Sequence, residues 1–379
     1  MEKIRIGDAC DILNGYAFKS DKYVDDGIRV IRIANVQKGY IEDNAPAFYP
    51  IDSDGLDKYI LEEGDLLMSL TGNVGRVALL QKEMLPAALN QRVACLRLKT
   101  DKITKGFLFH ILNSDFFEQQ CIQSSNGVAQ KNMSTEWLKD YEIPLYSIEE
   151  QLMITEVLDG ARKILSLRND ELSKLDDLIK ARFVEMFGSI KEEQLLGDIS
   201  EFVTVGIANS ATHAYAESGI PMLRNQNIKE NHLDDTDMIY IKPEFAAQYE
   251  SKKLKENDII AMRTGYPGVA CLVPKKYEGC QTFTTLIVRL KENNNPSYVC
   301  SYINSDLGKR FIDSEKVGVA QQNVGAKSLA KMPIKIAPKQ LQDEYADFVN
   351  QVDKSKVAVQ KSLDETQQLF DSLMQQYFG

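Results

Sequence analysis

The sequence lacks the closely spaced cysteines and histidines with which proteins hold structural metal ions. Its three histidines, His110, His213 and His232, show no metal-ligand spacing, and no CxxC pair occurs. Widely separated cysteines predict reduced thiols in the core rather than disulfides or metal sites. The six cysteines are Cys10, Cys95, Cys121, Cys271, Cys280 and Cys300.

Long apolar runs and an excess of positive charge are also missing. No segment approaches the roughly 20 apolar residues of a membrane span, and residues 1–16 show no apolar stretch followed by a cleavage site. We therefore expect a cytoplasmic protein that does not bind membranes. The net charge of −10 argues against coating nucleic acid by bulk electrostatics, so any DNA contact must come from local basic patches or a more basic partner.

Familiar catalytic strings are absent as well: the sequence has no GxxxxGK[ST], HExxH or GxSxG. The string "NPSY", Asn295–Tyr298, is similar to the Asn-Pro-Pro-Tyr motif of amino-methyltransferases but lacks its second proline. No glycine-rich strand-turn-helix for S-adenosylmethionine accompanies it. The structural alternative is a helix capped by Asn295 with Pro296 in its first turn. We predict that the chain catalyses nothing by itself and binds no cofactor.

What the sequence does contain is a second copy of itself, displaced by about 191 residues. "GVAQKN" at Gly127–Asn132 is matched by "GVAQQN" at Gly318–Asn323. "GDLLMSLTGNVGRVALL" from Gly64 is matched by "NDIIAMRTGYPGVACLV" from Asn257, which keeps a Thr-Gly-x-x-Gly turn. The chain is therefore predicted to be a duplication.

Each copy shows the same order of elements. Short β-branched or leucine-rich segments such as "DLLMSL" and "RVACLRLK" are separated by Gly, Asn, Asp and Pro, which predicts strands in a mixed sheet. One helix follows over residues 106–124, matched by residues 297–315. After the polar loop, each copy ends in a long stretch that closes with Phe-Gly, at residues 187–188 and 378–379.

Both long stretches carry heptads with a narrow apolar seam, which favours a coiled coil. The first seam comprises Leu158, Ala161, Leu165, Arg168, Leu172, Leu175, Ile179, Arg182 and Met186, and the second comprises Val349, Val352, Lys356, Val359, Leu363, Thr366, Phe370, Leu373 and Tyr377. The segment between the first helix and the second copy is short, so paired helices would run antiparallel. Two separate amphipathic helices, each on its own domain, are the alternative.

The sequence thus predicts an α+β protein with two tandem-repeat globular α/β domains and two long helices in an antiparallel coiled coil, related by a pseudo-two-fold axis. The globular domains are residues 1–147 and 189–338, and the helices are residues 148–188 and 339–379. The residues expected to form the coiled-coil surface for partner binding are Leu165, Leu172, Leu175, Ile179, Val359, Leu363, Phe370 and Leu373.

Two such heads could grip B-DNA at sites about one helical turn, roughly 34 Å, apart. The candidate contacts are polar and basic residues in the glycine-bearing turns and the repeated loop. They are Thr71, Asn73, Arg76, Gln130, Lys131 and Asn132 in the first head, and Arg263, Thr264, Tyr266, Gln321, Gln322 and Asn323 in the second. Asn and Gln can pair with adenine and Arg with guanine, while Lys holds phosphate. The alternative is that these loops are simply solvated turns.

The chain resembles the specificity subunit of Type I restriction-modification systems over essentially its whole length. In that family two target recognition domains alternate with two helical regions. The first copy matches the family's closing pattern with "GVAQKNMSTEWLKDYEIPLYSIEEQ", Gly127–Gln151. The second copy, "GVAQQNVGAKSLAKMPIKIAPKQLQ", has Lys335 and Leu341 where the family shows proline and glutamate. The motif therefore does not fix where the second long helix starts.

The resemblance implies a non-catalytic subunit that binds double-stranded DNA and docks two methylation subunits on its coiled coil. The partners would bring S-adenosylmethionine and adenine methylation, and two restriction subunits could add ATP-driven cleavage. Alternatives are the recognition subunit of a Type IIB-like system, a coiled-coil scaffold that binds proteins rather than DNA, and the methyltransferase suggested by "NPSY".

Overall fold

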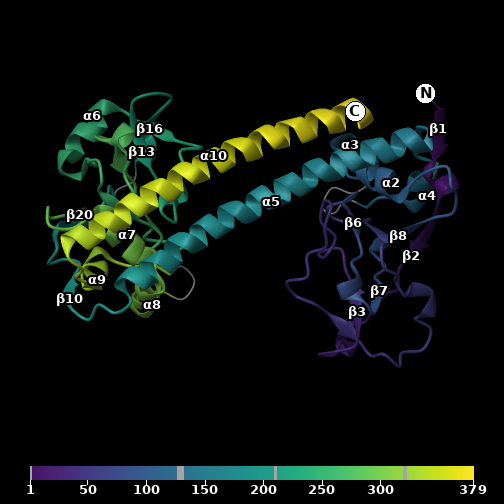
Figure 1. Ribbon diagram of the computed structural model, residues 1–379, viewed down its shortest axis with the longest axis horizontal. Helices are drawn as coiled ribbons and strands as arrows, with labels where there is room; N and C mark the ends of the chain where they lie inside the picture. The colour runs from purple at the N-terminus through teal and green to yellow at the C-terminus, as the bar shows by residue number, and fades with distance from the viewer. Residues whose placement is uncertain (1, 126–131, 209–210, 319–321) are drawn as a thin grey trace. The chain divides into compact units, whose positions relative to one another are not determined.

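The computed structural model describes residues 2–125, 132–208, 211–318 and 322–379 (Figure 1). The chain divides into two compact units: unit 1 is Met1–Asn169 with Lys361–Gly379, and unit 2 is Asp170–Gln360. Each unit therefore contains part of both long helices. Gln130, Lys131 and Gln321, three of the expected DNA contacts, lie outside the described residues.

Unit 1 is built on a four-stranded antiparallel sheet and a smaller mixed sheet. The larger sheet has the order β2 (Cys10–Asn14), β8 (Val93–Leu98), β5 (Leu66–Ser69), β6 (Val77–Leu79). The smaller has the order β4 (Phe48–Tyr49), β3 (Ile28–Ile31), β7 (Ala87–Leu89), and β3 pairs with β7 in parallel. β1 (Glu2–Arg5) pairs with β9 (Glu142–Leu145), just before the first long helix.

Unit 2 repeats this topology. Its main sheet has the order β11 (Ser200–Val205), β20 (Leu286–Leu290), β17 (Ile259–Ala261), β18 (Ala270–Leu272). A second sheet has the order β12 (Tyr215–Ala216), β16 (Ile239–Ile241), β13 (Ile220–Leu223), β19 (Gln281–Thr282), and β13 pairs with β19 in parallel. β14 (Ile228–Lys229) pairs with β15 (His232–Leu233), and β10 (Glu193–Leu195) with β21 (Pro333–Lys335). The equivalent pairings confirm the duplication.

The helix expected over residues 106–124 is two helices, so that prediction was wrong. α2 (Lys105–Leu112) ends before Asn113, and α3 (Asp115–Ser124) begins after Ser114. The Ser114 hydroxyl accepts a hydrogen bond from the backbone N–H of Phe117 at 3.2 Å, which caps the new helix. Unit 2 has the same corner between α7 (Pro296–Asn304) and α8 (Asp306–Glu315), capped by Ser305.

The long helices are α5 (Ile148–Phe187) and α10 (Lys339–Phe378). Every residue of the two predicted seams is buried or half-buried. In unit 1 the Tyr146 hydroxyl, just before α5, donates to the carbonyl of Tyr377 at 3.3 Å. In unit 2 the rings of Phe187 and Tyr345 lie 5.4 Å apart. The start of each helix thus meets the end of the other, so the pair is antiparallel and the alternative of two separate helices is wrong.

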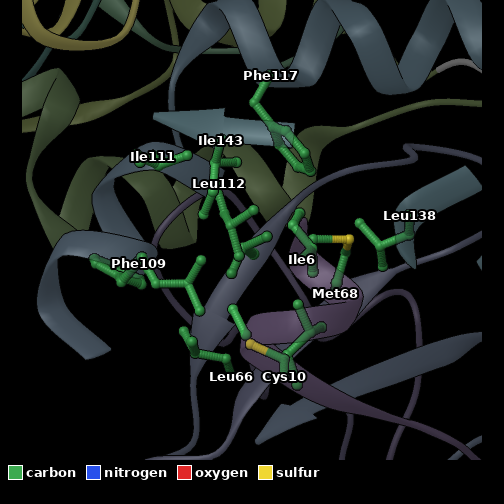
Figure 2. Packing of buried hydrophobic residues seen from close by; sticks show 14 of the residues in the cluster. Ile6, Cys10, Leu66, Met68, Phe109, Ile111, Leu112, Phe117, Leu138 and Ile143 are labelled. Carbon is green, nitrogen blue, oxygen red and sulfur yellow. The ribbon is translucent and has the colours of Figure 1, made fainter. Parts of the chain in front are cut away.

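The end of α10 belongs to the core of unit 1. Met374 and Phe378 join the buried cluster that contains Ile6, Leu112 and Phe117; Figure 2 shows these last three residues among their neighbours in the cluster. In unit 2 the end of α5 does the same, because the ring of Phe187 lies 4.4 Å from that of Tyr298. Burying one such ring contributes about 1.5–3 kcal/mol. Each helix end is therefore anchored by apolar packing.

A buried glutamine fixes the start of each long helix. The Gln151 side chain accepts from the backbone N–H of Thr104 at 2.8 Å and donates to the carbonyl of Tyr146 at 2.9 Å. The Gln342 side chain accepts from the N–H of Asn295 at 2.8 Å and donates to the carbonyl of Ala337 at 2.8 Å. The second helix therefore starts in the same way as the first, despite the altered motif.

Among the described residues no helix is long and apolar enough to cross a membrane. All six cysteines are buried as free thiols, and burial raises the pKa of Cys10 and of Cys121 to about 12. Such thiols are poor nucleophiles and poor metal ligands at neutral pH.

Candidate nucleic-acid interface

In unit 1 the candidate surface starts at the turn between β5 and β6. Gly72 and Gly75 adopt φ values of 74° and 81°, which side-chain-bearing residues rarely adopt. A Cβ on Gly75 would also lie 2.8 Å from the Cys121 sulfur. The glycines thus allow a tight turn that holds Thr71 half-buried and Asn73 exposed.

Asn132, at the end of the repeated polar loop, lies beside this turn. Thr71 and Asn132 form an antiparallel bridge, and the N–H of Met133 donates to the carbonyl of Leu70 at 2.9 Å. Two stretches that are about 60 residues apart in sequence therefore form one surface. The Arg76 guanidinium donates to the side chain of Gln37 and is half-buried, so part of its hydrogen-bonding capacity is already used.

A third segment of this surface was missed by the sequence analysis. The N–H of Leu70 donates to the carbonyl of Arg92 at 3.0 Å, which places the β7–β8 loop beside Thr71. Gln91 and Arg92 are exposed on this loop. The sequence did contain a pattern that could have predicted this segment. The polar string "NQR" stands between two apolar strands, and such a string is typical of a turn, here with a glutamine and an arginine.

Unit 2 repeats the arrangement with different side chains. Thr264 bridges Asn323, and the N–H of Val324 donates to the carbonyl of Arg263 at 3.1 Å. Tyr266 is 77% exposed at the tip of the β17–β18 turn, and such a ring can stack on a base or pack on a sugar. Gln322 is exposed on the repeated loop.

Asn225 is a further member of the unit 2 surface that the sequence analysis missed. Its side chain donates to the Thr264 hydroxyl at 2.8 Å and accepts from the N–H of Arg263 at 3.4 Å. It thereby joins the 225–227 turn to the β17–β18 turn. Because the contact spans 39 residues of sequence, no local pattern predicts it.

In each unit the structure brings together the described members of the predicted set. The surfaces carry amide, hydroxyl and guanidinium groups, which can bind base edges and phosphates. Within the described ranges no three His, Cys, Asp or Glu side chains gather in a way that could hold a metal ion. The exposed polar groups of these two surfaces suit recognition of a ligand.

The eight residues predicted to dock partners lie in the seam between the long helices, where they are buried or half-buried. Their side chains hold the helix pair together. The outer faces of the two helices also expose several apolar side chains. Among them are Leu178 at 46%, Val184 at 67% and Val357 at 71% in unit 2, and Leu369 at 57% in unit 1.

The string "NPSY" is part of a helix cap. Asn295 is the N-cap of α7, its side chain accepts from the N–H of Ser297 at 2.9 Å, and Pro296 occupies the first turn. The Asn295 amide also donates to the Asp343 carboxylate at 2.7 Å. The structural alternative for this string is thus confirmed.

Comparison with known proteins identifies the class to which this architecture belongs. The profile of the Type I restriction modification DNA specificity domain matches residues 1–176 and again residues 191–367. The two matches together cover most of the chain. The protein therefore belongs to the family of Type I restriction-modification DNA specificity proteins and carries the family's domain twice.

Similar curated proteins carry the same description. The EcoBI specificity subunit of Escherichia coli is 21% identical over an alignment of 408 positions, gaps included, that covers 98% of this chain and 83% of that one. The MjaVIII specificity subunit of Methanocaldococcus jannaschii is 29% identical over 182 residues, 46% of this chain and 42% of that one. The EcoAI specificity subunit of Escherichia coli is 34% identical over 164 residues, 42% and 28% of the two chains. The matches to the last two thus span less than half of each relative.

Solved structures show the same fold. The S subunit of a Type I restriction-modification system from M. genitalium aligns with a TM-score of 0.58 at 16% identity, covering 100% of this chain and 96% of that one. A chain from a structural study of complex assembly and conformational transition in the type I system aligns with a TM-score of 0.59 at 16% identity, covering 100% and 97%.

Proposed function

We propose that this chain is the DNA specificity subunit of a Type I restriction-modification complex. Residues 1–147 and 189–338 would be its two target recognition domains, each reading one half of a bipartite DNA sequence. The observation that carries the proposal is the repeated family domain, in which both copies pair the same glycine-bearing turn with the asparagine that ends the polar loop.

The two half-sites differ because the two surfaces differ at equivalent positions. Asn73 in unit 1 corresponds to Tyr266 in unit 2, and Arg76 corresponds to Val269. An asparagine can pair with adenine through two hydrogen bonds, whereas a tyrosine ring packs or donates one bond. The target is therefore asymmetric. In the first head Arg92 and the expected contacts Gln130, Lys131 and Asn132 supply further base or phosphate contacts.

Because the chain is acidic, we expect other subunits to make many of the contacts with DNA phosphates. Each cationic side chain that neutralises a phosphate releases a counterion, and this release supplies a large share of DNA affinity. A chain of net charge −10 can provide such contacts locally but cannot surround a duplex with positive charge. The isolated subunit therefore binds DNA weakly, and the assembled complex binds it tightly.

The partners in this proposal are two methylation subunits and, where present, two restriction subunits. The methylation subunits dock on the long helices and bring S-adenosylmethionine with the adenine-methylating site. The restriction subunits add ATP-driven translocation and cleavage. The curated relatives are specificity subunits by name, which supports a non-catalytic role for this chain as well.

The test is long-read methylation mapping in cells that express this chain with its methylation subunit. The expected result is one new methylated sequence with two defined halves and an unspecified spacer. The purified chain alone, given S-adenosylmethionine, should transfer no methyl group. Asn295→Ala removes the cap from α7 at a cost of about 1 kcal/mol and should leave the methylated sequence unchanged.

Two results would contradict the proposal. An unchanged methylome, with the complex formed and folded, would favour a protein-binding scaffold. Methyl transfer by the isolated chain that disappears in folded Asn295→Ala would restore the methyltransferase alternative.

A further inference from the structure

Each unit contains a groove at the place where a long helix ends on the globular domain. In unit 1 a cavity of about 420 Å³ is lined by the α2–α3 corner, the turn at Lys38 and Gly39, Arg162 and Leu165 of α5, and the last turns of α10. In unit 2 a cavity of about 380 Å³ is lined by the α7–α8 corner, the turn at Glu230 and Asn231, and the last turns of α5. The grooves are formed by equivalent elements.

Backbone contacts establish the equivalence residue by residue. The N–H of Gly39 donates to the carbonyl of Val77 at 2.8 Å, and the N–H of Asn231 donates to the carbonyl of Ala270 at 2.9 Å. Gly39 and Asn231 both have positive φ, 87° and 62°. Lys38 and Glu230, the residues before them, therefore occupy the same position in the two grooves.

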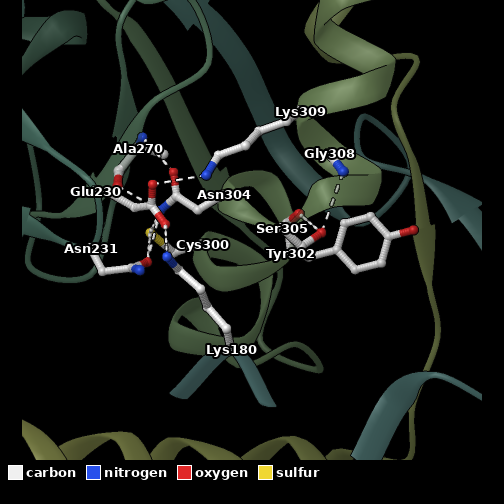
Figure 3. Close-up of polar contacts among 10 residues, drawn as sticks. All are labelled: Lys180, Glu230, Asn231, Ala270, Cys300, Tyr302, Asn304, Ser305, Gly308 and Lys309. Carbon is white, nitrogen blue, oxygen red and sulfur yellow. Dashed lines mark hydrogen bonds and ion pairs between the residues drawn. The ribbon is translucent and has the colours of Figure 1, made fainter. Parts of the chain in front are cut away.

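The charges of the two grooves are inverted at three equivalent positions. In unit 1 Lys38 pairs with Glu118 of α3 at 2.8 Å and also with Asp115 at the start of α3, and in unit 2 Glu230 pairs with Lys309 of α8 at 2.9 Å. The third position belongs to the incoming helix: Asp371 of α10 lines the groove of Lys38, and Lys180 of α5 lies 4.0 Å from Glu230. Figure 3 shows Lys180 and Lys309 directed at Glu230.

Each groove receives the helix of the other repeat. α5 starts in unit 1 but its end, with Lys180, belongs to unit 2, whereas α10 starts in unit 2 and its end, with Asp371, belongs to unit 1. The apolar anchors are alike, since Phe187 and Phe378 are both phenylalanines that meet an aromatic ring of a globular domain. Apolar packing thus gives little preference for one helix end over the other.

The charges do give a preference. With the helix ends exchanged, Lys180 would face Lys38 and Asp371 would face Glu230, which places like charges together in both grooves. Such an exchange arises when two copies of the chain pair like repeat with like repeat. Exchange of identical elements is a low-cost route to dimers, and repulsion against a wrong partner is the usual means of preventing it.

We propose that the inverted charges make each groove selective for the helix end of the other repeat, so that one chain closes on itself and a second copy of the chain is rejected. This selectivity of the grooves does not depend on whether the chain recognises DNA. Exposed ion pairs are individually weak, so the selectivity is the sum of modest contributions from the two grooves. It is screened by salt, because the Debye length falls from about 10 Å at 0.1 M to about 3 Å at 1 M.

The test uses the full chain and two variants. The first variant, Lys180→Asp with Asp371→Lys, exchanges the helix-end charges and leaves both globular domains unchanged. The second adds Lys38→Glu, Asp115→Asn, Glu118→Lys, Glu230→Lys and Lys309→Glu, which inverts the three positions in both grooves and removes the second carboxylate beside residue 38. Light scattering after size-exclusion chromatography measures the dimer fraction, and thermal unfolding measures stability, each at about 0.1 M and about 1 M salt.

The parent chain and the second variant should be monomers with similar unfolding midpoints. The first variant should unfold at a lower temperature and raise the dimer-to-monomer ratio about tenfold at low salt, with most of the effect lost at high salt. A first variant as monomeric and as stable as the parent would overturn the proposal. So would a second variant that fails to regain the parent's behaviour, including one that does not fold.

Discussion

At the scale of single residues, two side-chain amides determine where the long helices begin. Gln151 is fully buried, and its amide links the start of α5 to the N–H of Thr104, the N-cap of α2. Gln342 makes the equivalent link to Asn295, the N-cap of α7. A buried polar group that loses its hydrogen-bond partner destabilises the folded state much more than a polar group that water can solvate. The glutamine in each motif is thus a structural residue, although its position in a repeated motif could suggest a contact with DNA.

Gln151→Ala should lower the free energy of unfolding by about 1–3 kcal/mol, because the N–H of Thr104 and the carbonyl of Tyr146 lose their partner in the interior. Urea unfolding followed by circular dichroism measures the change. Gln376→Ala, at an exposed position of α10, is the matched control and should change stability little. Equal effects of the two substitutions would show that the buried amide does not hold the helix start.

His110 makes the stability of unit 1 depend on pH. Its ring is fully buried in α2, with Nε2 2.8 Å from an Asp159 carboxylate oxygen. Burial lowers the pKa of His110 from its ordinary 6.5, although the nearby Asp159 opposes this shift. The unfolded chain therefore binds the proton first as the pH falls. The stabilisation is complete above about pH 6.5 and declines below it.

We predict that the free energy of unfolding falls by up to about 1.4 kcal/mol per pH unit below pH 6.5 through this residue. His110→Ser introduces the residue found at the equivalent position of unit 2, Ser301, and should flatten that part of the profile. Urea titrations across this pH range give both curves. Parallel curves for the two proteins would mean that His110 does not cause the dependence.

At the scale of elements, the seam of the long helices depends on alternating three- and four-residue spacing. Leu172 and Leu175 are half-buried in the seam of unit 2, whereas Leu178, one turn further along, is 46% exposed. A carboxylate placed in an apolar seam loses its solvation without gaining a partner. A charge should therefore be tolerated at Leu178 but not at Leu172 or Leu175.

The double substitution Leu172→Asp with Leu175→Asp should separate the helices and abolish docking of the methylation subunits. Leu178→Asp, one turn away on the exposed side of α5, should leave the helix pair intact. Helix content by circular dichroism and co-purification with the methylation subunit give the two readouts. Wild-type stoichiometry in the seam variant would show that docking does not need the coiled coil.

The repeat and the seams could be predicted from the sequence because both depend on regular spacing. A period of 3.5 residues and an offset between copies remain visible without knowledge of any tertiary contact. The break between α2 and α3 was missed, since the apolar residues on both sides of Ser114 continue a helical pattern and the cap depends on one hydroxyl.

Only part of the candidate site was predicted from the sequence, because only part of it is formed by local patterns. Its glycine turns and the repeated loop are local patterns, so Thr71, Asn73 and Asn132 could be named in advance. Arg92 and Asn225 join the surface through pairings with residues far along the chain. Such pairings follow from the topology of the sheets, which periodicity alone does not determine.

At the scale of the whole molecule, the central claim is that two globular domains read DNA independently. Base contacts made by one domain do not touch the other half-site, so each domain should be exchangeable. The structure adds two requirements for the exchange. The incoming domain must keep an aromatic partner for Phe378, as Phe107 is at 5.6 Å, and a charge complementary to Asp371 of α10, as Lys38 is.

The most direct test is therefore to replace Met1 to Tyr146 with the corresponding domain of a relative that meets these requirements, and to map methylation in cells that also express the methylation subunit. We predict that one half of the methylated sequence changes and that the other half stays intact. A methylome in which both halves change, or in which neither does, would contradict the account, because the two domains would then not be independent readers of DNA.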